Sequence, residues 1–153
     1  MNKLKLLVYD FDGVMTDNKV YIDQNGIESV QVNRADGLGV SEIKKLGLKQ
    51  LIISTEKNSV VGSRAEKLKI PFLQGIDDKK SSLIKYCKEI NIDLRDVGFV
   101  GNDINDKEVM EIVGVSICPY DAHKDIIHIS DKILKSKGGD GVVREILDLI
   151  INK

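Results

Sequence analysis

Short apolar runs alternate with segments of helical periodicity along almost the whole chain. Four runs have the length and composition of buried parallel strands: Leu4–Tyr9, Gln50–Ile53, Val97–Val100 and Gly114–Ile117. The segments between them repeat apolar residues at three-to-four spacing and carry charges on the other side, as helices that cover a sheet do: Gly37–Leu46, Ser59–Leu68, Lys80–Ile90 and Lys107–Val113. This alternation predicts an α/β fold, a three-layer sandwich with a central parallel sheet of the Rossmann-like kind.

One stretch departs from the alternation. Between residues 19 and 32, two alternating runs flank Asn25-Gly26, which is a strong signal for a β-hairpin. Because an isolated hairpin is only marginally stable, we expect it to protrude from the sheet and to pack on another subunit. A further amphipathic helix is expected at about 141–151, and residues 1–153 are expected to form a single domain without a cap.

The composition excludes several classes of partner. The 153 residues are 42% hydrophobic and 31% charged, with a formal net charge of −1, so nothing favours binding to nucleic acid or to an acidic membrane surface. No apolar run approaches the roughly 20 residues that span a bilayer. Cys87 and Cys118 match no metal or redox spacing, which indicates reduced, buried thiols in a cytoplasmic protein.

Chemically useful side chains follow the predicted strands. Asp10 and Asp12 come directly after the first run and enter a turn at Gly13. Two carboxylates so placed can hold a divalent cation and point one oxygen at a phosphorus atom. Ser54, with Thr55 behind it, ends the second run, where a hydroxyl can donate to a phosphate oxygen, although Ser and Thr commonly cap helices as well.

Two more pieces complete a candidate phosphoryl-transfer site. Lys79, with Lys80 as its competitor, starts a predicted helix and offers an ammonium group to a phosphate. Residues 101–106, Gly-Asn-Asp-Ile-Asn-Asp, follow the third run and could complete the oxygen shell of Mg²⁺. Each piece alone is commonly a cap or a surface residue, but all of them fall at one edge of one sheet. A receiver domain, which phosphorylates an Asp on a middle strand, fits poorly, because the middle strand here ends in Ser54-Thr55.

This order of residues resembles that of the haloacid dehalogenase phosphatase superfamily, over about residues 4–151. The resemblance implies that Asp10 attacks phosphorus and becomes an aspartyl-phosphate. It implies that Asp12 is the general acid and base and that its backbone carbonyl binds Mg²⁺, the expected cofactor. Ser54 and Lys79 correspond to the phosphate-binding hydroxyl and lysine of that family.

Finer motifs resemble the small capless branch of 3-deoxy-octulosonate 8-phosphate phosphatases and their nonulosonate relatives: residues 10–17, Asp36-Gly37, Gln74-Gly75, Asp78-Lys79 and Gly138-Gly139. In these relatives the hairpin covers a neighbour's active site, so the resemblance implies a homotetramer. Four residues resemble the 2-keto-3-deoxy-nononate 9-phosphate enzymes more closely and are the candidate substrate-binding residues: Thr55, Glu56, Arg64 and Lys67.

One departure from the family pattern bears on function. Asn102 stands where a metal-binding Asp is expected, so either its amide oxygen or Asp103 would complete the metal site. A similar Gly-Asn motif occurs in the phosphatase-like domains of some CMP-sialate synthetases, where catalysis is weak or absent. Two hypotheses follow: a Mg²⁺-dependent phosphatase acting on a nonulosonate 9-phosphate or octulosonate 8-phosphate, or a weakly active or inactive phosphatase-like assembly module.

Overall fold

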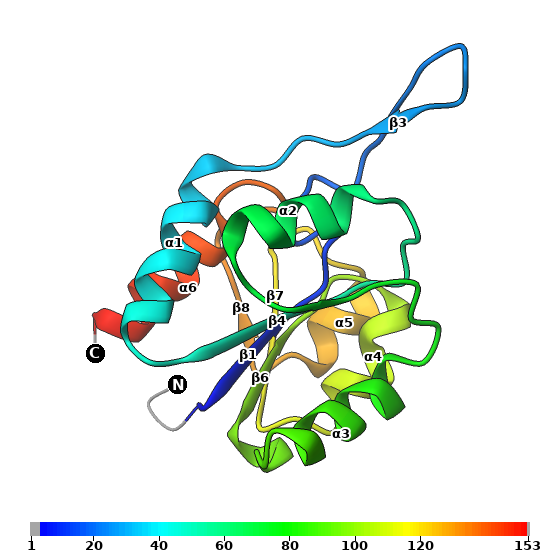
Figure 1. Ribbon diagram of the computed structural model, residues 1–153. Helices are drawn as coiled ribbons and strands as arrows, with labels where there is room; N and C mark the ends of the chain where they lie inside the picture. The colour runs from blue at the N-terminus through cyan, green and yellow to red at the C-terminus, as the bar shows by residue number, and fades with distance from the viewer. Residues whose placement is uncertain (1–3, 153) are drawn as a thin grey trace.

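The computed structural model describes residues 4–152 and is built around a six-stranded parallel sheet. Its strands are β1 (Leu6–Tyr9), β4 (Lys49–Ile53), β5 (Phe72–Leu73), β6 (Val97–Val100), β7 (Val115–Cys118) and β8 (Lys132–Ile133). Across the sheet they lie in the order β5-β4-β1-β6-β7-β8, so that β1 lies between β4 and β6 (Figure 1). The predicted parallel sheet is confirmed.

Helices cover both faces of this sheet, which confirms the three-layer sandwich (Figure 1). On one face lie α1 (Arg34–Lys45), α2 (Val60–Leu68) and α6 (Val142–Ile151). On the other lie α3 (Lys79–Glu89), α4 (Lys107–Met110) and α5 (Lys124–Ile129). Short 3-10 turns at Leu94–Asp96 and Ile104–Asp106 precede β6 and α4. Among residues 4–152, no helix is long and apolar enough to cross a membrane.

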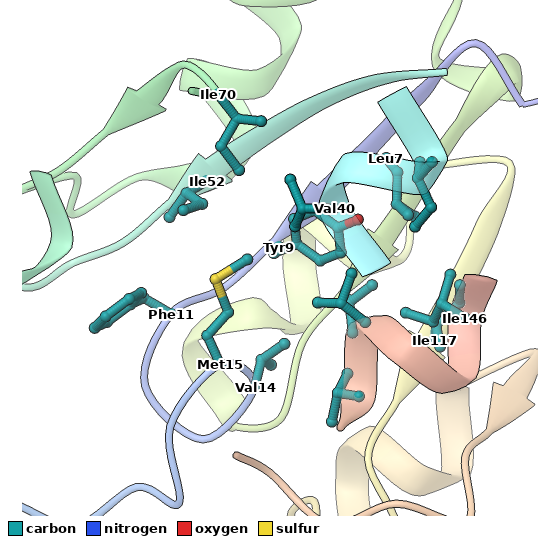
Figure 2. Packing of buried hydrophobic residues seen from close by; sticks show 14 of the residues in the cluster. Leu7, Tyr9, Phe11, Val14, Met15, Val40, Ile52, Ile70, Ile117 and Ile146 are labelled. Atoms are coloured by element: carbon teal, nitrogen blue, oxygen red, sulfur yellow. The ribbon is translucent and has the colours of Figure 1, made fainter. Parts of the chain in front are cut away.

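The central strand shows why the apolar runs contain so few polar residues. All four side chains of β1 are fully buried, because successive side chains point to opposite faces and both faces are covered. Leu7 and Tyr9 pack with α1 and α6, as Figure 2 shows, whereas Leu6 and Val8 belong to the cluster beneath α3 to α5. Burial on both faces fixes the position at which β1 ends, and therefore where Asp10 and the turn after it begin.

Element boundaries differ from the predictions where local hydrogen bonds decide them. α1 starts three residues earlier than predicted, since the Asn33 side chain accepts a hydrogen bond from the Ala35 N–H at 2.8 Å and caps the helix. α4 ends at Met110 rather than at Val113. Neither α5 nor β8 was predicted, because both are too short to show a periodic pattern in the sequence.

The predicted hairpin is present and projects away from the sheet (Figure 1). Its strands, β2 (Tyr21–Ile22) and β3 (Glu28–Ser29), pair antiparallel, and an isolated bridge between Thr16 and Val32 joins its base. Apolar side chains on it are left uncovered within the chain: Tyr21 is 69% exposed and Ile22 is 64% exposed. Few contacts within one chain therefore hold the hairpin in place.

A buried carboxylate joins α1 to α6. Asp36, only 2% exposed, accepts hydrogen bonds from the backbone N–H groups of Val143 at 2.9 Å and Arg144 at 3.1 Å, in the first turn of α6. A helix N-terminus favours a negative charge at this position. Burial nevertheless raises the pKa of Asp36 to about 6, against these hydrogen bonds, and its second oxygen has no partner. The contact therefore fixes α6 at the cost of a buried charge.

We predict that the Asp36→Asn substitution changes how stability depends on pH. The folded state binds the Asp36 proton more tightly than the unfolded chain, so protonation stabilises the fold, and this contribution is lost as the pH rises from about 4 through 6. Asn keeps the Oδ1 acceptor and does not titrate. In urea denaturation, the variant should gain stability relative to the unsubstituted protein between pH 4 and pH 7, by at most about 3 kcal/mol. Parallel pH profiles would contradict a buried charge at this position.

Candidate active site

The predicted site residues meet at the carboxyl edge of the sheet, around the end of β1. Asp10 follows β1, Ser54 follows β4, and Asn102 lies in the loop after β6. Because β1 lies between β4 and β6, the chain leaves the sheet in opposite directions on its two sides, which opens the crevice where such sheets bind ligands. The topology thus brings together groups that are far apart in sequence.

A buried ammonium group on α3 links the end of β1 to the loop after β6. Lys79 Nζ, in the first turn of α3, lies 2.8 Å from Asp10 Oδ1 and 2.6 Å from Asp106 Oδ1. Lys79, Asp10 and Asp106 are 2%, 5% and 0% exposed. Burial alone would lower the pKa of Lys79, but attraction to both carboxylates raises it above its ordinary value. Burial, followed by the charge of Asp106, raises the pKa of Asp10 to about 7, although Lys79 opposes the shift.

The loop after β6 is wrapped around Asp106. Its Oδ2 accepts hydrogen bonds from the N–H groups of Asn102 at 2.9 Å and Asp103 at 3.4 Å, while its Oδ1 binds Lys79. A side chain at Gly101 would overlap Asp106, since a Cβ there would lie 2.7 Å from the Asp106 Cβ. The sequence analysis placed Asp106 in an acidic loop suited to Mg²⁺ but did not predict its ion pair with Lys79, because only the folded loop turns it inward. Its position at the start of a helix, four residues after Asn102, is the only sequence signal.

Oxygen atoms suited to Mg²⁺ converge beside this network. One end of the Asn102 side-chain amide lies 2.9 Å from the Asp12 carbonyl oxygen and 3.2 Å from Asp10 Oδ2. With its oxygen at that end, an amide, a carbonyl and a carboxylate face one another, a donor set that Mg²⁺ accepts. Within residues 4–152 no group of three His, Cys, Asp or Glu side chains is placed to hold a metal.

The two candidates for the last metal ligand occupy different positions. Asn102 faces the Asp10 carboxylate, as described above. The Asp103 side chain instead accepts a hydrogen bond from the Ile104 N–H at 2.7 Å and, with Asp106, forms a capping box at the 3-10 turn. The geometry thus places the Asn102 side chain, and not that of Asp103, against Asp10 Oδ2 and the Asp12 carbonyl.

Asp12 is held at the mouth of the site by the turn that follows it. Thr16, fully buried, closes this turn by accepting hydrogen bonds from the N–H groups of Gly13 and Asn18, at 3.2 Å each. Burial, then the charge of Glu56, raises the pKa of Asp12, whereas the Thr16 hydroxyl opposes this shift. A raised pKa suits a group that must deliver a proton. Thr16 was not identified from the sequence, since its role depends on how this turn closes.

The remaining predicted residues are divided between the site and its surroundings. Ser54, 1% exposed, and the half-buried Thr55 follow β4, the strand paired with β1, and Ser54 Oγ accepts from the Glu56 N–H at 3.1 Å. Glu56 and Asp12 line a cavity of about 230 Å³ between the hairpin and the loop before α2. Neither Arg64 nor Lys67 lines this cavity.

Arg64 and Lys67 both lie further along α2. The Arg64 Nη2 group donates to the Asn33 carbonyl at 2.9 Å, and its buried Nε has no partner. Lys67 is exposed. Arg64 therefore holds α2 to the start of α1 within this chain.

The glycine run before α6 packs on the turn that follows Asp12. A Cβ at Gly138 would lie 2.2 Å from the Gly13 carbonyl oxygen, so only glycine permits this approach. The Gly139 N–H donates to the Val14 carbonyl at 3.0 Å, and the Gly139 carbonyl accepts from the Asn33 side chain at 3.3 Å. The last third of the chain thus supports the turn that carries Asp12.

The sequence agrees with this geometry. The family model of the haloacid dehalogenase-like hydrolases matches residues 14–146, and the chain belongs to that family. The 3-deoxy-D-manno-octulosonate 8-phosphate phosphatase of Escherichia coli K12 is 34% identical over 149 residues, which cover 97% of this chain and 79% of the relative. The corresponding enzyme of Yersinia pestis is 32% identical, with 97% of this chain and 80% of the relative covered.

Solved structures agree closely as well. A hydrolase of the haloacid dehalogenase family from Streptomyces avermitilis superposes with a TM-score of 0.96 at 43% identity, covering 98% of this chain and 86% of that one. The octulosonate 8-phosphate phosphatase of Moraxella catarrhalis, solved with magnesium, phosphate and KDO, gives 0.94 at 30% identity, covering 98% and 87%. Within its family the chain is of this capless phosphatase type, a phosphoric monoester hydrolase.

We predict that the Asp106→Ala substitution destabilises the fold by about 3–5 kcal/mol, because it leaves the buried Lys79 with one partner and removes the acceptor of the Asn102 N–H. Urea denaturation measures the loss. Glu108→Ala, at an exposed position of α4, is the matched control and should change stability by less than about 0.5 kcal/mol. Equal stability of the two variants would show that Asp106 does not hold the network together.

Proposed function

We propose that this protein is a Mg²⁺-dependent phosphatase that hydrolyses a phosphorylated keto-deoxy sugar acid, either a nonulosonate 9-phosphate or an octulosonate 8-phosphate. The single observation that carries the proposal is the placement of Asp10. One oxygen of its carboxylate is bound by the buried Lys79, and the other lies 3.2 Å from the end of the Asn102 amide that also approaches the Asp12 carbonyl. A carboxylate between the Lys79 ammonium and a group of oxygen atoms that can bind Mg²⁺ is placed to attack a phosphate.

Asp10, the Asp12 carbonyl and Asn102 would hold the Mg²⁺, which when bound draws charge from the phosphate oxygens. The Asp10 carboxylate attacks phosphorus, a new O–P bond forms, and the bond from phosphorus to the sugar oxygen breaks. Lys79 and the Ser54 hydroxyl offset the charge on the remaining phosphate oxygens.

Asp12 moves the protons in both half-reactions. It first gives its proton to the departing sugar oxygen and then takes one from a water molecule. That water attacks phosphorus, so the acyl-phosphate bond breaks, Asp10 is regenerated and inorganic phosphate leaves. Thr16 holds the turn that carries Asp12, through its hydrogen bonds with the N–H groups of Gly13 and Asn18.

The substrate assignment rests on the cavity beside Asp12. Glu56 lines it and can accept hydrogen bonds from sugar hydroxyl groups, with Thr55 beside it. The sugar carboxylate requires a cation, and since Arg64, Lys67 and Arg144 do not line this cavity, a basic residue from a neighbouring subunit would supply it. At about 230 Å³ the cavity is smaller than the roughly 300 Å³ or more of ordinary ligand pockets, which supports completion by another chain.

A second candidate function is a phosphatase-like assembly module with little turnover. Asn102 favours it, because a neutral amide attracts Mg²⁺ less strongly than the carboxylate that the family normally carries. The two functions differ in one respect that an assay can measure, which is turnover at millimolar Mg²⁺.

A panel of sugar phosphates tests the proposed function. With Mg²⁺, we expect the nine-carbon and eight-carbon keto-deoxy acid phosphates to be hydrolysed at least about tenfold faster, by kcat/KM, than hexose phosphates, because a sugar carboxylate adds a charge-assisted contact. Asp10→Asn should lower kcat by at least about a thousandfold, and EDTA should abolish turnover.

The outcomes of this panel are distinct. Equal rates on hexose phosphates would contradict the sugar-acid assignment, and an active Asp10→Asn variant, folded by its melting curve, would contradict the nucleophile. No turnover of any substrate would favour the assembly module.

We further propose that the protein is a homotetramer in which the hairpin of one subunit covers the site of another, and that it functions in the cytoplasm. The exposed apolar side chains of the hairpin, Tyr21, Ile22 and Ile27, support the assembly. The two free, buried cysteines, Cys87 and Cys118, fit a reducing compartment.

Removing the apolar contacts of the hairpin tests this assembly. The double variant Tyr21→Ser, Ile22→Ser should lower the molar mass measured by light scattering and should reduce kcat/KM, because the cavity loses its cover. Lys88→Ser, an exposed position on α3, is the control and should change neither quantity. A double variant with the mass and activity of the unsubstituted protein would argue against a role for the hairpin in assembly.

A further inference from the structure

The Asn102 side chain has a fixed position and one remaining freedom. Its backbone N–H donates to Asp106 Oδ2 at 2.9 Å, and its carbonyl accepts from the His123 N–H at 2.8 Å. The residue is 7% exposed, and its side chain packs so closely on Gly13 that a Cβ there would lie 2.0 Å from the amide. The one large motion left to this side chain is a 180° rotation of the amide about the Cβ–Cγ bond, which exchanges the positions of the oxygen and the nitrogen.

The two orientations have opposite chemical consequences. With nitrogen at the inner end, the amide donates hydrogen bonds to the Asp12 carbonyl at 2.9 Å and to Asp10 Oδ2 at 3.2 Å, so two buried acceptors are satisfied. With oxygen at that end and Asp10 ionised, three oxygen atoms gather at one point without a hydrogen between them. Only a cation makes the second arrangement favourable.

We propose that the Asn102 amide closes the cation site of the metal-free protein as a hydrogen-bond donor and turns over to present its oxygen when Mg²⁺ binds. The inference rests on the proposed use of Mg²⁺ and adds to it a role for the asparagine. A carboxylate at this position has no hydrogen to donate, and it would place a second negative charge beside Asp10. Asparagine therefore stabilises the metal-free site and weakens Mg²⁺ binding, whereas aspartate does the reverse.

This exchange predicts effects of opposite sign in one variant. In EDTA, Asn102→Asp should melt about 3 °C or more below the unsubstituted protein, because two hydrogen bonds are lost and a charge is added. In calorimetric titration with Mg²⁺ alone, the same variant should bind about tenfold more tightly, and its melting temperature should rise more. Asn102→Ala loses the NH₂ donor, so its melting temperature in EDTA should fall. It also loses the amide oxygen and gains no charge, so its Mg²⁺ affinity should fall as well.

Asn105→Asp is the matched control. It makes the same chemical change three residues along the same loop, at an exposed position, and should leave both quantities close to those of the unsubstituted protein. The half-turn itself can be followed by ¹⁵N NMR of the Asn102 side-chain NH₂, assigned by its disappearance in Asn102→Asp. Its protons should exchange slowly in EDTA and should shift and exchange faster once Mg²⁺ saturates the site.

The results separate this inference from the proposed function. If Mg²⁺ binds but Asn102→Asp melts like the unsubstituted protein in EDTA, or if the NH₂ signals do not respond to the metal, the inference is overturned. If none of the proteins binds Mg²⁺, the metal dependence in the proposed function fails, and the reorientation fails with it. The EDTA melts then still show whether the amide donates to Asp10 and Asp12.

Discussion

The architecture of the site depends on one buried charge arrangement, in which the Lys79 ammonium is shared between the carboxylates of Asp10 and Asp106. Removing charges from water costs several kcal/mol per ion, so none of the three groups is stable there without the others. The arrangement joins α3 to the end of β1 and to the loop after β6. It also leaves one negative charge in excess, which an additional cation would balance at the side of Asp10 that Lys79 does not occupy.

The rest of the fold holds these three side chains in position. Burial of β1 on both faces fixes where Asp10 leaves the sheet, and the sheet order places the other two strand ends on either side of it. Asp36 fixes α6, and the glycine run before α6 supports the turn that carries Asp12. The hairpin is the exception, because few contacts within one chain hold it. It is therefore the part of the fold that most depends on a neighbour.

Much of this could be predicted from the sequence, for a physical reason. Buried strands and amphipathic helices leave regular apolar patterns, and in a parallel sheet the residues that follow strands meet at one edge, so Asp10, Ser54 and Lys79 could be grouped before any coordinates were known. Asp106 and Thr16 could not be identified in this way, since each acts through a short loop whose turns direct its side chain inward. Elements as short as α5 and β8 have no period to detect.

The sequence also could not distinguish Asn102 from Asp103 as the candidate metal ligand. In the structure the Asn102 amide lies against Asp10, whereas the Asp103 side chain makes a capping hydrogen bond.

The most direct test of the central claim is a crystal structure with Mg²⁺ and beryllium fluoride, which mimics a phosphoryl group on a carboxylate. The account predicts beryllium bonded to an Asp10 oxygen, with Lys79 within hydrogen-bonding distance of a fluorine and Mg²⁺ between Asp10, the Asp12 carbonyl and Asn102. Beryllium fluoride bound elsewhere, with Asp10 unmodified, would contradict it.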